Sequence, residues 1–346
     1  MISRRVTSQD VAKRAGVSRT TVSLVLNRVE GVQISEQTRK RVIRIANELG
    51  YVPEAAAQAL ASRRSQFIGL ILSRNPEHIA TDAFLSQIIN SLVEMVRQNG
   101  MRLLIDIVED TQHRDSYLEL AWGRRIDGIL LSGPRVDDQA LMTLEQDGFP
   151  TVLMGDLPNT NFCSVDVDNR AAAKLAVAHL LKLGHRRIAC ITNASLVYTA
   201  AVERLEGYRD ALVAAGIPYD PGLVRHGDFG PESGRRQMNA LLKLKNPPTA
   251  AFIASDVVAI GAMSAIRARG LAIPDDIAVV GFDDVPFARY VDPPLTSIHL
   301  PAVELARKAT EILLHLIRRE EPQIRNVVLD TQLVVRASCG AQAAAP

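Results

Sequence analysis

Cysteine is scarce in this chain, and the cysteines that occur are not arranged for a disulfide framework or a metal site. Cys163, Cys190 and Cys339 are odd in number, far apart and never in a CxxC pair. Such spacing argues against disulfides and structural zinc, and it favours a reducing compartment such as the cytoplasm. We expect neither a metal nor another cofactor.

Long hydrophobic runs are also lacking. No stretch approaches the ~18 consecutive apolar residues of a membrane span, and the basic N-terminal residues precede no apolar signal-peptide segment. Export and membrane insertion are therefore not expected. Aromatic residues make up only 4% of the chain, so an aromatic side chain in a binding cleft would stand out.

The chain does contain enough apolar sequence for several cores. Its 346 residues exceed a typical domain of ~150 residues about twofold, and 47% of them are hydrophobic. The net charge of +2 is segregated: residues 1–64 carry 12 Lys and Arg against 5 Asp and Glu, whereas residues 65–346 carry 28 against 33. A basic N-terminal segment suggests a polyanion partner, although a solubilising basic arm has the same composition.

Three short helices are predicted in the basic segment. Capping residues predict where each helix begins, namely Thr7, Ser18 and Ser35. The second helix is expected over Arg19–Leu26 and the third over Glu36–Leu49, with glycine after the first and third helices to end them. The first two helices then form a helix-turn-helix, and all three can share one small core.

The predicted surface distinguishes a DNA-binding unit from a generic helical hairpin. Arg19, Thr20 and Thr21 lie at the N-terminal end of the second helix, where a recognition helix meets base edges in the major groove. Arginine can read guanine with two hydrogen bonds, and threonine can contact a base or a thymine methyl group. The third helix carries further basic residues: Arg39, Lys40, Arg41 and Arg44.

These motifs resemble a known family. The runs that carry the resemblance are Val6–Ser18, Thr21-Val22-Ser23, Asn27, Thr38-Arg39 and Leu49-Gly50-Tyr51-Val52-Pro53. They closely resemble the headpiece of the LacI/GalR family of bacterial transcriptional regulators, and further matches extend the resemblance to about residue 338. It implies a helix-turn-helix headpiece over 1–52 and a hinge helix or linker over 53–64.

The resemblance also implies that the hinge helix inserts Leu60 into the minor groove. Alanines such as Ala59 permit close approach of two hinges, and an exposed leucine can wedge between base steps. An alanine-rich linker whose leucine packs on the body is the alternative. The residues that we expect to contact DNA are Thr7, Ser18, Arg19, Thr20, Thr21, Ser23, Asn27, Thr38, Arg41, Ala59 and Leu60.

Two residues depart from the family pattern. Leu24 stands at the recognition-helix position that is often a base-reading arginine, so the operator sequence cannot be carried over. Glu54 replaces the usual asparagine after the hinge proline, which weakens the predicted cap and brings a negative charge near phosphates.

The rest of the chain alternates apolar runs with amphipathic stretches. Phe67–Leu72 is followed by a predicted helix over 84–99, and the same alternation continues to Ile277–Gly281. Apolar strands between helices predict parallel sheets covered on both faces, and the number of units predicts two doubly wound lobes. Ligands bind such lobes at the carboxyl ends of the strands.

The resemblance supplies the topology of this α/β body. Leu183–Ala189, Arg204–Tyr208, Ile273–Asp283 and Pro294–Ile298 match a periplasmic-binding-protein-like body whose chain crosses between two lobes three times. It implies an effector-binding domain over 65–340, followed by a disordered tail over 341–346. We expect the first lobe at about 65–164 and 296–323, and the second at about 165–292 and 324–340.

The resemblance implies an effector cleft between the lobes. Its expected residues are Ser73, Phe84, Tyr198, Arg204, Phe229, Ser255 and Asp283. A carboxylate and a guanidinium can bond sugar hydroxyls, and an aromatic ring can stack on a sugar ring. Taken singly, the aromatic residues also fit a core and Arg204 a solvated helix face. Asp256 after Ser255 and the run Met154-Gly155-Asp156 depart from the family and leave the ligand unidentified.

Other motifs in the body do not support catalysis. His179 and His185 are six residues apart without a convergent acid, so we interpret them as structural. The glycine-rich run Gly227–Gly234 meets neither nucleotide-binding motif, and no GxSxG occurs. We therefore expect no catalytic residues.

The sequence predicts a cytoplasmic repressor that binds double-stranded operator DNA and a sugar-like effector. A homodimer is preferred because no leucine heptads follow Ser338. A sugar- or nucleoside-binding α/β protein or enzyme without a regulatory role is the rival. The effector, the operator and the choice between inducer and corepressor stay open.

Overall fold

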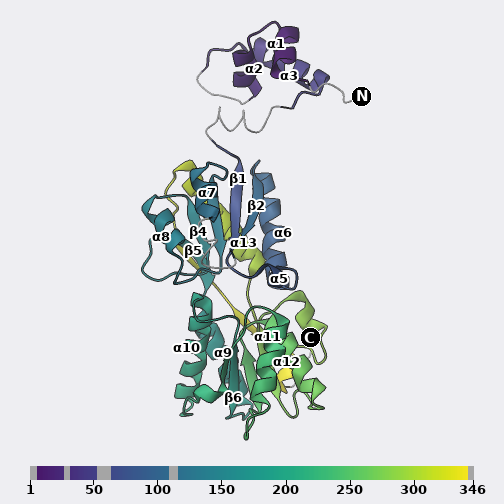
Figure 1. Ribbon diagram of the computed structural model, residues 1–346, viewed down its shortest axis with the longest axis vertical. Helices are drawn as coiled ribbons and strands as arrows, with labels where there is room; N and C mark the ends of the chain where they lie inside the picture. The colour runs from purple at the N-terminus through teal and green to yellow at the C-terminus, as the bar shows by residue number, and fades with distance from the viewer. Residues whose placement is uncertain (1–5, 27–31, 53–63, 109–115, 342–346) are drawn as a thin grey trace. The chain divides into compact units, whose positions relative to one another are not determined.

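The computed structural model describes residues 6–26, 32–52, 64–108 and 116–341. Within these ranges the chain forms a unit of three helices near its N-terminus and an α/β body with two sheets (Figure 1). Among the helices that the structure describes, none is both long and apolar enough to cross a membrane.

The three N-terminal helices form as their capping residues predict. They are α1 (Ser8–Ala15), α2 (Arg19–Leu26) and α3 (Glu36–Leu49). Thr7 and Asp10 form a reciprocal capping box at α1, and the Ser35 hydroxyl accepts a hydrogen bond from the backbone N–H of Thr38 at α3. Eight apolar side chains make their core: Val11, Ala12, Ala15, Val22, Val25, Val42, Ile45 and Ala46.

The first sheet of the body has the strand order β11-β5-β4-β3-β1-β2. Its strands are β1 (Phe67–Leu72), β2 (Arg102–Ile107), β3 (Gly128–Ser132), β4 (Thr151–Met154), β5 (Cys163–Val167) and β11 (Asn326–Leu329). Its helices are α5 (Pro76–Ile79), α6 (Ala83–Gln98), α7 (Ser116–Trp122), α8 (Gln139–Gln146) and α13 (Ala302–Arg318). The central strands β3 and β4 are buried throughout, which explains their unbroken apolar sequence.

The second sheet has the order β12-β10-β9-β8-β6-β7. Its strands are β6 (Ile188–Thr192), β7 (Val224–His226), β8 (Ala250–Ile253), β9 (Ala278–Asp283), β10 (Thr296–His299) and β12 (Gln332–Val334). Its helices are α9 (Asn169–Lys182), α10 (Thr199–Ala214), α11 (Pro231–Leu241) and α12 (Asp256–Ala268), with 3-10 turns at Pro221–Leu223, Pro286–Arg289 and Ala337–Cys339. Both sheets are predominantly parallel, as predicted, and β12 runs antiparallel to β10.

The chain passes between the sheets at other residues than the sequence predicted. β5 keeps residues 163–167 in the first sheet, where the expected crossing was at 164. β10 pairs with β9 in the second sheet, although 296–323 was assigned to the first lobe. β11 pairs with β5 in the first sheet, although 324–340 was assigned to the second. Strand pairing decides these limits, and the local sequence does not encode it.

Glycines allow the helices of the second lobe to pack very closely. A Cβ atom at Gly261 of α12 would lie 1.7 Å from the carbonyl oxygen of Pro231, and one at Gly234 of α11 would lie 1.9 Å from that of Val258. Neither position could therefore hold a side chain without moving a backbone. The α11–α12 contact helps to position Ser255, the residue that precedes α12.

We predict that Gly261→Ala destabilises the protein by about 3 kcal/mol. Overpacking against the backbone at Pro231 outweighs the gain in helix propensity, which is at most about 1 kcal/mol. Ser264→Ala is the matched control, because Ser264 is exposed on the same helix and its change should stay within about 0.5 kcal/mol. Urea unfolding midpoints compare the variants, and equal midpoints would contradict the close contact.

Candidate functional site

The exposed N-terminal end of α2 is the candidate DNA-reading surface. Arg19 and Thr20 are exposed there, and Ser23 is exposed further along the helix. The Ser18 hydroxyl accepts from the backbone N–H of Thr21, at 3.0 Å, and lies 2.9 Å from the Thr21 hydroxyl. Ser18 and Thr21 therefore fix the start of the helix, and the side chains of Arg19 and Thr20 are exposed beside it.

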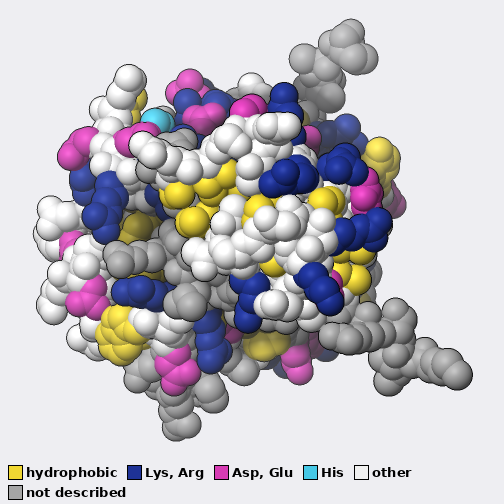
Figure 2. All heavy atoms as spheres, turned by 90° about the horizontal axis from the view of Figure 1, so that it is seen from above, with side chains coloured by type: hydrophobic (Ala, Val, Ile, Leu, Met, Phe, Trp, Pro, Cys, Tyr) yellow, Lys and Arg dark blue, Asp and Glu magenta, His cyan; other side chains and the backbone are white. Residues whose placement is uncertain are grey.

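Other predicted DNA contacts also lie at helix starts. Thr7 and Thr38 both take part in N-terminal caps, of α1 and α3. Arg41 is exposed on α3, and within the described residues no ion pair involves Arg19 or Arg41. Helix N-termini and unpaired guanidinium groups both attract phosphate. The face drawn in Figure 2 shows dark-blue Lys and Arg side chains distributed among apolar and polar ones.

Some predicted DNA contacts and the predicted hinge lie outside the described residues. These are Asn27, Glu54, Ala59 and Leu60, together with the rest of 53–63 and the tail from 342 onward. Leu24 is half-buried on α2. The roles of all these residues in DNA binding stay predictions.

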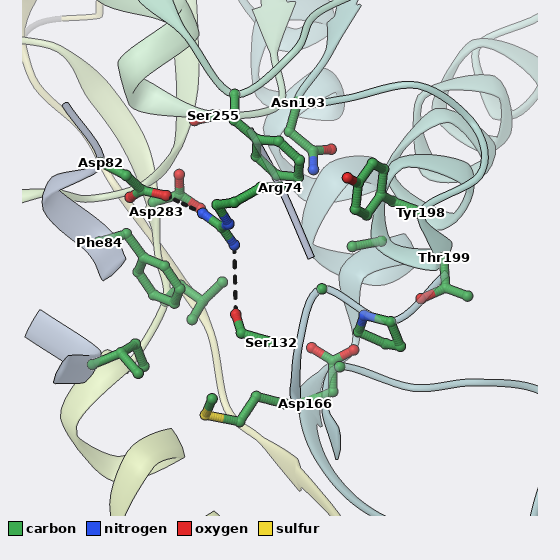
Figure 3. Close-up of a pocket in the computed structure, with 18 of the residues that line it drawn as sticks. Arg74, Asp82, Phe84, Ser132, Asp166, Asn193, Tyr198, Thr199, Ser255 and Asp283 are labelled. Atoms are coloured by element: carbon green, nitrogen blue, oxygen red, sulfur yellow. Dashed lines mark hydrogen bonds and ion pairs between the residues drawn. The ribbon is translucent and has the colours of Figure 1, made fainter. Parts of the chain in front are cut away.

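A pocket lies between the two sheets of the body, at the carboxyl ends of their strands (Figure 3). Its volume is about 90 Å³, enough for a small polar ligand or several water molecules. The predicted cleft residues Phe84, Tyr198, Arg204, Phe229, Ser255 and Asp283 all line it. Ser73 is the exception: it is buried, and its carbonyl oxygen accepts a 2.9 Å hydrogen bond from the Tyr198 hydroxyl.

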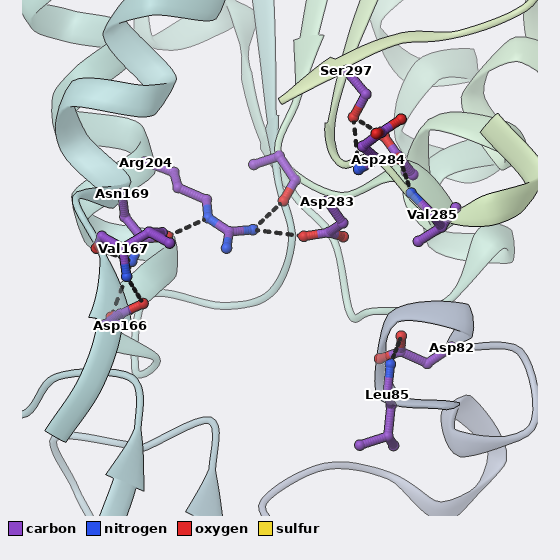
Figure 4. A network of polar contacts seen from close by, with 12 residues as sticks. Asp82, Leu85, Asp166, Val167, Asn169, Arg204, Asp283, Asp284, Val285 and Ser297 are labelled. Carbon is purple, nitrogen blue, oxygen red and sulfur yellow. Dashed lines mark hydrogen bonds and ion pairs between the residues drawn. The ribbon is translucent and has the colours of Figure 1, made fainter. Parts of the chain in front are cut away.

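Arg204 is the centre of a buried polar network in the second lobe (Figure 4). Its Nε donates to Asn169 Oδ1 at 2.8 Å, and its Nη1 donates to the Ala254 carbonyl at 2.7 Å and lies 3.7 Å from Asp283 Oδ1. The guanidinium carbon lies 3.8 Å from the centre of the Phe282 ring. Burial lowers the pKa of Arg204, and the neighbouring carboxylates oppose this effect. Arg204 is therefore held rigidly at the pocket wall and is not a solvated helix residue.

Asp283 faces the pocket in a strained and desolvated position. Its φ of 110° is a value that residues with side chains rarely adopt. Burial raises its pKa to about 7, although Arg204 and a hydrogen bond from Ser255 favour the ionised form. Backbone strain of this kind is often retained at functional sites.

The two departures from the family pattern have structural explanations. Asp256 is fully buried and accepts hydrogen bonds from the Ser297 hydroxyl, at 2.6 Å, and from the Val285 backbone, at 2.9 Å. It joins α12 to β10 and does not line the pocket. Gly155 and Met154 line the pocket, whereas Asp156 does not. Neither Asp256 nor Asp156 is therefore placed to contact a ligand directly.

Sequence reasoning missed Arg74, Asp82 and Ser132. Arg74 follows β1, is 6% exposed and forms an ion pair with Asp82. Its Nη2 lies 3.5 Å from the Ser132 hydroxyl, and its guanidinium carbon lies 4.7 Å from the centre of the Phe229 ring in the other lobe. Figure 3 shows its side chain reaching between Asp82 and Ser132. A charged residue two positions after the end of an apolar strand was the available signal.

Asp166 and Asn193 were missed as well, and both line the pocket. Asp166 lies in β5 and accepts a 3.1 Å hydrogen bond from the Asn169 amide, which links it to Arg204. Asn193 follows β6. A polar residue near the end of an apolar strand was again the available signal in the sequence. Whether two such residues face the same pocket depends on the order of the strands in the sheets.

The histidines make structural contacts, as interpreted from the sequence. His179 Nε2 lies 3.3 Å from Cys339 Sγ, and His185 Nδ1 lies 3.1 Å from the Thr249 hydroxyl. Among the residues that the structure describes, no group of three His, Cys, Asp or Glu side chains could hold a metal ion.

Known proteins match both parts of the chain. Residues 7–54 match the family described as bacterial regulatory proteins, lacI family, and residues 177–339 match the periplasmic binding protein-like domain. The regulator CelR of Thermobifida fusca is 36% identical over 338 residues, which are 97% of this chain and 98% of CelR. The repressor CytR of Escherichia coli K12 is 35% identical over 335 residues, 96% of each chain.

Solved structures agree with the sequence relatives. A CelR–cellobiose complex superposes with a TM-score of 0.75 and covers 96% of this chain and 100% of that chain, at 35% identity. A Lac repressor dimer bound to operator and the anti-inducer ONPF has a TM-score of 0.83, 31% identity, and coverage of 98% and 100%. Both matches extend over the helical unit and over the two-sheet body.

The raised pKa of Asp283 predicts a pH-dependent stability. The native carboxyl ionises near pH 7, whereas an unfolded aspartate ionises near pH 4. The native state holds an extra proton between these values, so the free energy of unfolding should decrease as the pH rises through this window. Asp283→Asn should reduce this decrease, as measured by urea unfolding at pH 5 and pH 8. The exposed Asp275→Asn should keep the wild-type difference, and an unchanged difference in Asp283→Asn would contradict the assignment.

Proposed function

The chain belongs to the LacI family of bacterial regulatory proteins, and we propose that it is a sequence-specific transcriptional repressor controlled by a sugar-like effector. The observation that carries this proposal is the presence in one chain of a helix-turn-helix unit and a two-lobed ligand pocket. The sequence match to the regulators CelR and CytR extends over almost the whole length of both relatives.

The DNA side of the proposal is supported by the surface of the helical unit. Arg19 and Thr20 are exposed at the start of α2, and Arg41 is exposed on α3. Arg19 and Thr20, at the start of the recognition helix, can reach base edges. Arg41, on the neighbouring helix, is suited to contact phosphates. A DNA partner also supports a cytoplasmic location.

The effector side is supported by the chemistry of the pocket. Carboxylates and guanidinium groups can bond several hydroxyls at once, and Phe229 offers an aromatic face. The solved relative CelR was described with cellobiose. A sugar or sugar derivative fits this polar lining better than an apolar ligand does.

A homodimer is the assembly that fits DNA recognition. Helix-turn-helix proteins commonly bind two half-sites of a near-palindromic operator as a symmetric dimer. The related Lac repressor was described as a dimer on its operator. The rival interpretation, an α/β enzyme, is disfavoured by relatives that are transcriptional regulators.

The recognition role of α2 can be tested with two arginines. Arg19→Ala should lower the preference for an operator selected from random duplexes by about 1–3 kcal/mol. Arg41→Ala should instead weaken binding to all sequences and reduce the salt dependence of affinity, because phosphate contacts release counterions. Fluorescence anisotropy with selected and random duplexes measures both effects. Equal losses on both duplexes for Arg19→Ala would exclude base reading.

The effector site can be tested through its coupling to DNA binding. A sugar found by thermal-shift screening should change operator affinity by about 1–3 kcal/mol, and the operator should change sugar affinity equally. Asp283→Asn should remove this response, whereas the exposed Asp275→Asn should keep it. If the sugar is an inducer, Asp283→Asn binds operator at all sugar concentrations; if it is a corepressor, binding stays weak. A wild-type response in Asp283→Asn would show that the effector binds elsewhere.

A further inference from the structure

The pocket contains more carboxyl groups than cations. Asp82, Asp166 and Asp283 line it, together with the guanidinium groups of Arg74 and Arg204. Arg74 is paired with Asp82, and Arg204 with Asp283. Each cation therefore already faces a carboxyl group of the protein, and an anionic ligand would have to compete with that group for it.

Asp166 is the carboxyl group of these three that has no ion-pair partner among the described residues. Arg204 favours its ionised form, but only at longer range than an ion pair. Asp166 accepts hydrogen bonds from the Asn169 amide, at 3.1 Å, and from the backbone N–H of Val167, at 2.8 Å. Glu203 and Asp156 add negative charge nearby. Burial raises the pKa of Asp166 to about 6, so the group is mostly ionised at neutral pH.

Two further polar atoms at the pocket lack partners. Arg74 Nε and Asn193 Oδ1 are buried and make no hydrogen bond within the part of the chain that the structure describes. Both residues are more than nine-tenths buried, at 6% and 4% exposure, and they belong to different lobes. Unsatisfied buried polar atoms are costly, so a ligand that supplies one acceptor and one donor would be favoured and would bridge the lobes.

We propose that the effector is a small polyhydroxylated compound with a protonated amine, which pairs with Asp166 while its hydroxyls bond Arg74 Nε and Asn193 Oδ1. This inference rests on the proposed function and specifies its ligand as an aminated sugar. A neutral sugar would leave Asp166 as an unpaired, partly desolvated charge. A uronate or sugar phosphate would bring a further negative charge to a pocket with surplus carboxylates.

The charge preference can be tested without knowing the stereochemistry of the effector. Three achiral probes share a branched polyol frame: tris(hydroxymethyl)aminomethane is cationic, pentaerythritol is neutral, and 2,2-bis(hydroxymethyl)propionate is anionic. Titrations of the full chain in amine-free buffer, followed by calorimetry or NMR, give their affinities. The cationic probe should bind about tenfold tighter than the neutral one, and the anionic probe weakest.

Variants assign the preference to Asp166. Asp166→Asn keeps the side-chain volume but removes the charge, so it should abolish the preference for the cationic probe while still binding the neutral one. Asp275→Asn removes an exposed carboxylate outside the pocket and should leave the preference unchanged. Equal binding of cationic and neutral probes, absence of binding by any probe, or a preference that persists in Asp166→Asn would each overturn the inference.

Amino sugars extend the test to regulation. Glucosamine and galactosamine are compared with glucose and galactose, both for binding and for their effect on operator affinity. Operator binding without an amine preference would overturn this inference and leave the proposed function standing. An amine preference without specific operator binding would overturn the proposed function instead.

Discussion

A buried guanidinium is the constraint around which the pocket is built. Removing an arginine from water costs several kcal/mol unless its charge is paired and its N–H groups are bonded. Arg204 meets this requirement with groups from three separate elements: Asn169 at the start of α9, the Ala254 carbonyl after β8, and Asp283 at the end of β9. These elements are consequently held in one arrangement, and the strained backbone of Asp283 is held with them. Loss of any one partner would leave a buried charge unsatisfied.

Side-chain contacts also join the two lobes beside the pocket. Tyr198 of the second lobe donates to the Ser73 carbonyl and lies against Arg135, whose guanidinium carbon is 5.0 Å from the Tyr198 ring centre. Arg74 of the first lobe lies over Phe229 of the second. Tyr198, Arg74 and Phe229, which make these contacts, also line the pocket. A ligand that bonds the same groups can therefore change the relative free energies of lobe arrangements, which is the physical requirement for an allosteric effector.

The helical unit depends on simpler and more local interactions. Hydroxyl caps at Thr7, Ser18 and Ser35 begin its helices, and Gly16 and Gly50 end two of them in the left-handed region. Its small apolar core leaves the basic side chains outside. The contacts that form this unit therefore lie within it and involve none of the residues that line the pocket.

Local patterns in the sequence determined the helical unit and the class of the body. Capping residues act on N–H groups within three residues, and apolar runs report burial along one strand, so the helix limits of α2 and α3 and the parallel sheets could be predicted. Family resemblance located Arg204 and Asp283. Only the tertiary structure decided that β10 pairs with β9, that Asp82 neutralises Arg74, and that Asp166 and Asn193 face the same cavity. The order of the strands brings these residues together from distant positions in the sequence, and their burial then determines which of them are ionised. Neither the strand order nor the burial is encoded in any short stretch of the chain.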